Sequence, residues 1–248
     1  MQIVHITDQH VGGPDEQPYG VDVRAHFLAL CQRIREIKPD YLVVTGDLSL
    51  TSGDAEIYQW IKFHLDQVGV PYAVLSGNHD DPNLLAHAFS LEDHLHDGEL
   101  FYTRRWEDDW VLFLDSTPGA ISDFQLDWLR RQLSEAGGAP RLLFMHHPPV
   151  LAEVPHMDDH YPLLEPSRRA LNRIFGEYQG PVHVFCGHYH NAREVHQGDN
   201  HVYITPSSYL QIDPFQKDFA VDHTCPAFRY IDWRPPRVLT SVHYLMPK

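Results

Sequence analysis

Five short apolar runs in this sequence each end in a small group of Asp, Asn or His residues. The runs cover residues 2–7, 41–45, 72–75, 141–145 and 182–186, and their length and composition are typical of buried strands. In open α/β sheets, the carboxyl ends of parallel strands meet and form ligand sites. We therefore predict one shared site from the residues that follow the five runs, which are Asp8, His10, Asp47, Asn78, His146, His188 and His190.

The segments between these runs predict an α/β protein. Apolar residues recur at helical spacing over 27–37, 57–68 and 126–133, and a further helix is expected from Ser167. Ser122 and Gln125 form a capping-box pattern at the start of the third of these helices. Runs 100–106 and 110–114 predict a hairpin, and runs 202–205, 228–233 and 238–244 predict an antiparallel, β-rich end. A length of 248 residues suits a single domain over residues 1–248.

The segment 148–166 differs from the rest because it contains five prolines. Proline removes a backbone donor and fixes φ, so neither a helix nor a strand is expected to run through the segment. A connection of this length without secondary structure is often a functional lid. An ordinary surface loop is the equal alternative.

The composition excludes several classes of partner. The 19 basic and 34 acidic residues give a formal net charge of −15, which argues against binding of polymeric nucleic acid or an anionic membrane. Neither an apolar run of about 18 residues nor a signal-peptide pattern is found. Cys31, Cys186 and Cys225 have no C-x-x-C spacing, which favours a reducing cytoplasm. The oligomeric state stays open, and a homo-oligomer is one of the options.

The seven residues at the predicted strand ends have the chemistry of metal ligands. Carboxylate, imidazole and amide donors without sulfur suit Mn, Fe or Zn rather than a structural thiolate zinc site. Seven donors are too many for one tetrahedral ion, whereas two ions are sufficient if one carboxylate bridges them. Asp47 is central in the chain order of these donors. Gly46, Gly77 and Gly187 directly precede three of them, where the backbone must turn sharply.

These residues also form recognisable sequence blocks. The blocks Asp8-x-His10, Gly46-Asp47, Gly77-Asn78-His79-Asp80, His146-His147-Pro148 and Gly187-His188-x-His190 resemble those of the calcineurin-like metallophosphoesterases. The resemblance implies a two-sheet β-sandwich flanked by helices. It implies one ion on Asp8, His10, Asp47 and His190, and a second ion on Asp47, Asn78, His146 and His188. His79 would contact the phosphate or protonate the leaving group.

Further blocks are similar to those of the class III cyclic-nucleotide phosphodiesterases, a group that also contains glycerophosphodiesterases. They are the Gly-Asn-His-Asp form, the His-His-Pro-Pro run, residues 205–208, residues 227–229 and the pair Met157-Asp158. Asp158 is therefore expected to contact substrate, together with His79 and Asn78. His147 has two possible roles: it contacts the substrate, or it forms hydrogen bonds that support the neighbouring metal ligands. Tyr209 and Phe215 could stack on a nucleobase, although core packing is favoured for both.

The sequence thus predicts a metal-dependent phosphoric diester hydrolase. The hypothesis is in-line attack on a small diester, above all 3′,5′-cyclic AMP or another cyclic nucleotide, by a hydroxide that bridges the metals, with Asp47 and His79 as the catalytic residues. Two divalent ions, two aspartates and one hydroxide leave about +1 at the site, which suits a small anion. The alternatives are a glycerophosphodiesterase, a nuclease or a nucleotide phosphatase on the same site, and, last, a binding scaffold without catalysis.

Overall fold

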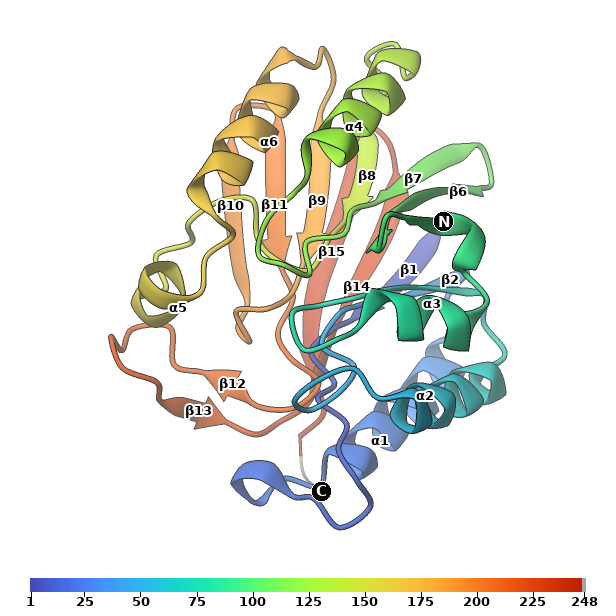
Figure 1. The fold of residues 1–248 in the computed structure, drawn as a ribbon, viewed down its shortest axis with the longest axis vertical. Helices are drawn as coiled ribbons and strands as arrows, with labels where there is room; N and C mark the ends of the chain where they lie inside the picture. Colours follow the sequence, from blue (N-terminus) through green and yellow to red (C-terminus); the bar gives the residue numbers. More distant parts are fainter. Residues whose placement is uncertain (247–248) are drawn as a thin grey trace.

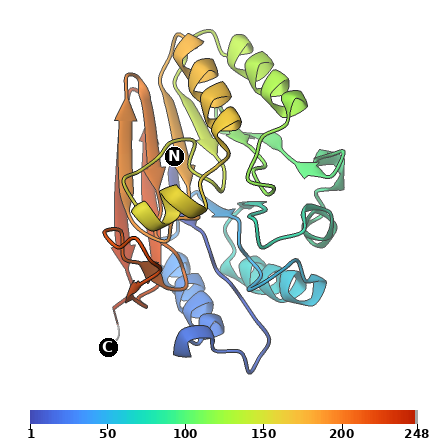
Figure 2. The same cartoon turned by 60° about the vertical axis from the view of Figure 1, so that its left-hand side comes forward.

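A computed structural model describes residues 1–246 of the chain, and two β-sheets packed face to face form its centre (Figures 1 and 2). The five-stranded sheet has the order β15-β14-β1-β2-β3. Its strands are β1 (Gln2–Ile6), β2 (Tyr41–Thr45), β3 (Tyr72–Leu75), β14 (Ala227–Arg234) and β15 (Arg237–Tyr244). The six-stranded sheet has the order β10-β11-β9-β8-β7-β6. Its strands are β6 (Tyr102–Trp106), β7 (Asp109–Phe113), β8 (Arg141–Phe144), β9 (Val182–Cys186), β10 (Arg193–Gln197) and β11 (Asn200–Ile204).

Helices cover the outer faces of the sandwich. Apolar residues of α1 (Val23–Ile37), α2 (Ala55–Val68) and α3 (Pro82–Phe89) share a buried cluster with the five-stranded sheet. Residues of α4 (Asp123–Glu135) and α6 (Glu165–Glu177) share a second cluster with the six-stranded sheet, and Figure 1 shows both helices in front of it. The predicted α/β class, a sandwich flanked by helices, is confirmed.

Side chains alternate between the two faces of each strand, and this alternation determines which core each residue enters. In β9, Val184 and Cys186 point toward α4 and α6, whereas Phe185 lies in the cluster that joins the two sheets. Phe144 of β8 follows the same rule and packs between the sheets, with its ring centroid 5.6 Å from that of Phe185. Since successive strand residues face opposite sides, one strand supplies both cores.

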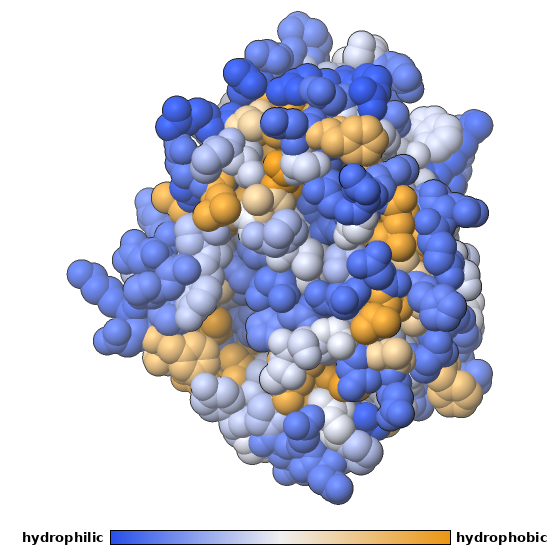
Figure 3. All heavy atoms as spheres, viewed as in Figure 1, coloured by the Kyte–Doolittle hydropathy of each residue, from blue (hydrophilic) through white to orange (hydrophobic). Residues whose placement is uncertain are grey.

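The short elements complete the chain. They are the 3₁₀ turns η1 (Pro18–Gly20) and η2 (Glu92–His94), helix α5 (Pro155–His160), and the strand pairs β4 (Leu95–His96) with β5 (Glu99–Leu100) and β12 (Gln211–Ile212) with β13 (Val221–His223). Figure 3 shows that the face viewed in Figure 1 is largely hydrophilic, with hydrophobic side chains in small separate groups. None of the helices formed by residues 1–246 combines the length and the apolar character that a bilayer span requires.

Some local predictions need correction. The segment 148–166 is not free of helix, because α5 begins at Pro155 inside it and α6 begins at Glu165, before the expected Ser167. Proline is well tolerated at the first helical position, where its missing N–H has no partner to lose. β10 was not predicted, and β11 pairs in parallel with β9 inside the region expected to be antiparallel.

The predicted capping box at Ser122 is only half formed. The Ser122 hydroxyl accepts a bond from the backbone N–H of Gln125 at 3.1 Å. The Gln125 side chain, however, turns away and bonds both backbone groups of Asp115, at 2.7 and 2.9 Å. Because both ends of the Gln125 amide are bonded to the backbone there, the side chain does not form the reciprocal cap.

The arrangement of the parallel strands creates the edge where the site lies. β1, β2 and β3 run in parallel in one sheet, and β7, β8 and β9 run in parallel in the other. The two sets end at the same edge of the sandwich, as shown by the bond of 3.0 Å from the His188 N–H, just after β9, to the Asp8 carboxylate, just after β1.

Candidate metal centre

The loops at this edge have an unusual backbone. Asp8, His10, Asp47, His188 and His190 all have φ between 45° and 67°, in the left-handed region. Non-glycine residues adopt this region rarely and at a cost of about 1 kcal/mol or more. Five of the seven predicted ligands therefore share a conformation that sequence propensity opposes, which is typical of a functional site.

Two glycines allow the loops to approach one another. Gly46 has a φ of 83°, and a Cβ placed on it would lie 2.5 Å from Nδ1 of His146. A Cβ on Gly187 would lie 2.5 Å from Oδ2 of Asp8. Real Cβ atoms do not come this close to other atoms, so a side chain at either position would displace a predicted ligand.

The first group of donors contains Asp8, His10, Asp47 and His190. One donor atom of each lies within 4.8 Å of the others. Nε2 of His10 is 3.1 Å from Nε2 of His190 and 3.5 Å from Oδ2 of Asp47, and Nε2 of His190 is 3.3 Å from Oδ1 of Asp8. All four residues are buried.

The second group contains Asp47, His146 and His188. Nε2 of His146 lies 3.4 Å from Oδ2 of Asp47 and 3.2 Å from Oδ1 of Asn78, which brings the amide to the same place. Asp47 belongs to both groups. The structure thus brings together all seven predicted ligands, with one carboxylate between two sets.

Backbone carbonyls fix the orientation of three histidine rings. Nδ1 of His146 bonds the Thr45 carbonyl at 2.8 Å, and Nδ1 of His190 bonds the Leu210 carbonyl at 3.1 Å. Nε2 of His188 bonds the Tyr161 carbonyl at 2.8 Å. Because a carbonyl only accepts, each of these nitrogens carries a proton, which leaves the other nitrogen of each ring as the one available to a cation.

This tautomer pattern fits bound cations. Nε2 of His146 and Nε2 of His190 face the Asp47 and Asp8 carboxylates, and each of these contacts requires a proton or a cation between the two atoms. Carboxylate, imidazole and amide donors are those that Mn, Fe and Zn accept. The cluster of donors is therefore compatible with a site for two metal ions.

Burial sets the charge of the histidines. It lowers the pKa of His10 and of His188 to about 4, so both rings are neutral near pH 7 and suited to bind a cation. Burial opposes protonation of His146 as well, but the Asp47 and Asp8 carboxylates outweigh it and raise the pKa of His146 to about 9. A cation bound there would have to displace that proton.

Asp80 joins the loops that follow β2 and β3. Its carboxylate accepts bonds from the N–H groups of Leu48, Ser49 and Gly77 at 2.9 to 3.1 Å and from the Tyr58 hydroxyl at 2.9 Å. Burial and the nearby Asp47 charge raise the pKa of Asp80 to about 6. Asp80 therefore fixes the relative position of Asp47 and Asn78, although it belongs to neither group of metal donors.

The predicted substrate contacts divide into two sets. Asn78 and His79 line a pocket of about 550 Å³ above the donors. His147 and Asp158 are not among the residues that line it. His147 is 3 % exposed and bonds Ser116 Oγ through Nδ1 at 2.9 Å. The Asp158 carboxylate accepts bonds from the N–H groups of Ala152 and Val154 and from the Tyr189 hydroxyl, which closes the turn before α5.

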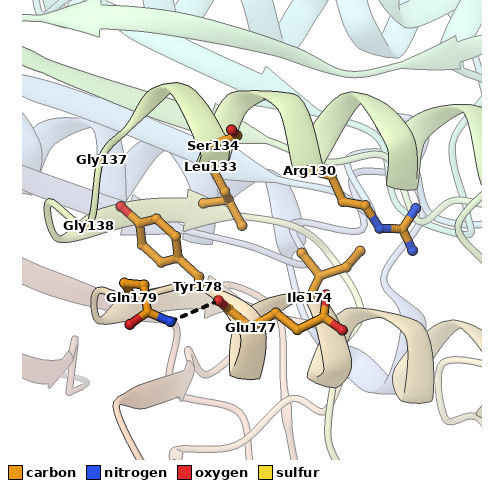
Figure 4. A pocket seen from close by; sticks show the side chains of 9 residues that line it. All are labelled: Arg130, Leu133, Ser134, Gly137, Gly138, Ile174, Glu177, Tyr178 and Gln179. Carbon is orange, nitrogen blue, oxygen red and sulfur yellow. Dashed lines mark hydrogen bonds between the residues drawn. The ribbon is translucent and has the colours of Figure 1, made fainter.

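A second pocket lies elsewhere, between the ends of α4 and α6 (Figure 4). It is lined by Leu133, Ile174, Tyr178 and neighbouring residues, and its one dashed bond joins Gln179 to the Glu177 carbonyl. These helix ends lead into the amino ends of β8 and β9, at the edge opposite the metal donors. No group of metal donors was found among its lining residues, all of which the structure describes.

The comparison with known families decides the family of the chain. The calcineurin-like phosphoesterase profile matches residues 1–192, which include all seven donors. The chain belongs to the calcineurin-like phosphoesterase family.

Relatives of this phosphoesterase carry related names. It is 31 % identical over 244 residues to a protein of Fibrobacter succinogenes named "Probable cyclic nucleotide phosphodiesterase", covering 98 % of this chain and 94 % of the relative. It is 28 % identical to the 3′,5′-cyclic adenosine monophosphate phosphodiesterase CpdA of Escherichia coli, covering 99 % and 90 % of the two chains. It is 29 % identical to the glycerophosphodiester phosphodiesterase GpdQ of Enterobacter lignolyticus, covering 96 % and 86 %.

Solved structures support the fold. The crystal structure of a dimetal phosphatase from Danio rerio aligns with a TM-score of 0.71 at 12 % identity, covering 97 % of this chain and 95 % of that one. Family and relatives together show that this phosphoesterase is a metal-dependent phosphodiester hydrolase.

Sequence reasoning missed several groups of this phosphoesterase site. The carbonyls of Thr45, Tyr161 and Leu210 orient the ligand rings, and backbone atoms leave no signal in a sequence. Tyr19 and Phe219 line the pocket although neither belongs to any of the sequence motifs. Tyr209, considered for base stacking, also lines it, with its ring 5.6 Å from that of His10, whereas Phe215 does not.

Proposed function

We propose that this chain hydrolyses small phosphodiesters with two divalent cations, and that its substrate is 3′,5′-cyclic AMP or another cyclic nucleotide. The observation that carries the proposal is the presence of two donor groups that share Asp47 beside one pocket. One cation would bind Asp8, His10, Asp47 and His190, and the other would bind Asp47, Asn78, His146 and His188. When bound, the pair would supply a hydroxide nucleophile and neutralise developing charge on the phosphate.

The residues of the chain have separate tasks in this proposal. Asp47 would hold both cations, and its Oδ1 also accepts the His79 N–H at 2.9 Å. Nδ1 of His79 bonds the Leu50 carbonyl at 2.9 Å, so Nε2 is the free nitrogen of a ring that lines the pocket. In its doubly protonated form, with Nδ1–H kept on the Leu50 carbonyl, His79 can deliver the proton of Nε2 to the departing oxygen. The Asn78 amide lies on the same wall and orients the phosphate.

The charge of the pocket favours a diester. Neither Lys nor Arg is among its lining residues in the part of the chain that the structure describes, so the cations would provide the positive charge. About +1 at the centre matches a singly charged diester, while the formal net charge of −15 repels a polynucleotide. The three cysteines are free, which supports the proposal of a reducing, cytoplasmic environment.

The test is hydrolysis by protein stripped of metal and reloaded with Mn, Fe or Zn in turn. We expect turnover of 3′,5′-cyclic AMP, less of a glycerophosphodiester and least of AMP, a monoester. Asp47→Asn should lower kcat/KM for the cyclic nucleotide by more than about 100-fold, since it weakens both sites.

The matched control is Asp108→Asn, the same change at an exposed turn residue, which should leave turnover unaltered. Equal turnover by Asp47→Asn and the wild type would overturn the mechanism. Faster turnover of the glycerophosphodiester than of every cyclic nucleotide would show that glycerophosphodiesters are the substrate class instead.

A further inference from the structure

Three segments that are distant in the sequence meet at the mouth of the pocket. They are the loop around η1, helix α5, and the loop between β12 and β13. They contribute Tyr19, His156 and Phe219, in that order, to the wall of the same pocket. In Figures 1 and 2, α5 lies beside the β12–β13 pair. A bond of 3.4 Å from His156 Nδ1 to the Lys217 carbonyl links these two segments.

The rings of these residues form a connected cluster. The ring centroids of Tyr19 and Phe219 are 5.5 Å apart and those of His156 and Phe219 are 5.8 Å apart. His156 also lies 5.6 Å from the ring of Tyr161, which lines the same pocket. These separations are in the range of favourable aromatic pairs.

Two of the three cluster residues are well exposed. Tyr19 is 70 % exposed and Phe219 is 41 % exposed, whereas His156 is 9 % exposed. Exposed apolar groups gathered at a pocket that also holds polar donors are typical of a ligand site. Other lining residues of the mouth, such as Pro18 and Ile212, are apolar too.

We propose that the cluster of Tyr19, His156 and Phe219 binds a flat aromatic group attached to the substrate's phosphate, a nucleobase in a cyclic nucleotide. The inference rests on the proposed function for the position of the phosphate, which the donors at the base of the pocket would hold. An aromatic surface without lining Lys or Arg suits a base better than a glycerol arm or a second phosphate, since every base has a face that can stack. The pocket volume of about 550 Å³ is within the range of small-ligand sites.

The experiment measures binding to metal-loaded protein with two ligands that differ only by the base. AMP and ribose 5-phosphate carry the same phosphate and sugar, so calorimetry of the two isolates the aromatic contribution. We expect the wild type to bind AMP at least about tenfold more tightly, and Tyr19→Ala or Phe219→Ala to bring that ratio toward one.

Three variants serve as controls. Tyr19→Phe and Phe219→Tyr keep a ring and should keep the ratio. Phe215→Ala removes an aromatic side chain that is 80 % exposed but lies outside the pocket, and it should also keep the ratio. Circular dichroism and thermal unfolding of each variant check that the fold is retained.

Kinetics give an independent result. In Tyr19→Ala and Phe219→Ala, the KM for cyclic AMP should rise about tenfold with kcat nearly unchanged, because the lost contact is equal in ground and transition states. A wild-type ratio near one, or equal ratios in wild type and alanine variants, would overturn the aromatic site even if cyclic AMP is hydrolysed. Selective AMP binding that depends on Tyr19, without diester hydrolysis, would support the site and reject the proposed function instead.

Discussion

At the scale of single residues, the identity of the donors was predictable and their backbone conformation was not. Asp8, His10 and Asp47 could be grouped because each follows an apolar run, and the ends of parallel strands meet. Their left-handed φ angles oppose local propensity and are imposed by contacts such as the His10 N–H bond to the Asp47 carbonyl at 2.8 Å. Only the folded chain supplies these contacts.

Asp158 shows the limit of motif reasoning at this scale. Its position after Met157 in a proline-rich segment predicts a substrate contact. The structure uses its carboxylate for backbone N–H groups and Tyr189 Oη at 2.7 Å, which leaves it off the pocket lining. Asp158 therefore supports the turn before α5, the helix whose C-cap residue Tyr161 orients His188 through its carbonyl, and a role in binding substrate stays a prediction.

His5 gives a prediction for stability against pH. Its ring is fully buried and bonds Thr45 Oγ1 at 2.6 Å and Thr205 Oγ1 at 2.8 Å, and burial together with Arg229 lowers its pKa to about 3. The unfolded chain, with a histidine pKa near 6.5, binds the proton that the folded chain rejects. His5 therefore lowers the free energy of unfolding as pH falls from about 6.5 to about 3, by up to about 1.4 kcal/mol per pH unit.

Urea unfolding of metal-free protein at several pH values measures this slope. The variant His5→Gln keeps a polar side chain that cannot be protonated, so its slope should be shallower than that of the wild type by up to one proton. The surface variant His87→Gln, at a residue whose side chain is 82 % exposed, should keep the wild-type slope. Equal slopes in all three proteins would contradict a buried, neutral His5.

At the scale of elements, apolar periodicity predicted well those strands that are buried on both faces. β2, β3 and β9 have the predicted limits because continuous apolar runs give the strand its own signal. β10 was missed since its side chains are mostly exposed and polar, and its identity comes from pairing with β11. α5 was missed because prolines at Pro155 and Pro162 lie at its first position and beyond its end, where they do not break it.

The turn after β9 gives a prediction at this scale. Gly187→Ala would place a methyl group against Asp8 and Thr7, and the backbone would have to shift. We expect a loss of about 1–3 kcal/mol in the free energy of unfolding and a weaker affinity for metal at the group containing Asp8. Gly176→Ala is the matched control, because nothing lies within 4 Å of its added Cβ in α6.

Thermal unfolding and metal titration of both variants test this explanation of the glycine. Gly176→Ala should be neutral or slightly stabilising, since alanine favours a helix interior by up to about 1 kcal/mol. Wild-type stability and metal affinity in Gly187→Ala would contradict the explanation that close packing against Asp8 requires glycine at this position.

At the scale of the whole molecule, two sheets bring five loops to one edge. The sequence predicted the sandwich through its resemblance to a family, whereas periodicity alone predicted only alternating strands and helices. The aromatic mouth could not be predicted, because Tyr19, His156 and Phe219 come from the loop around η1, helix α5 and the loop between β12 and β13, which meet only after folding. The chain has a formal net charge of −15, so the positive charge at the site would come from the predicted pair of cations. The proposed function therefore depends on metal loading.

The central claim is that Asp47 joins two cation sites, and counting bound metal tests it most directly. Metal-free protein is dialysed against Mn or Zn, and the metal content is measured by mass spectrometry. The wild type should bind about two ions per chain, His10→Ala and His188→Ala about one each, and Asp47→Ala fewer than one. A wild type that binds one ion or none, or an Asp47→Ala variant that retains two, would contradict the account.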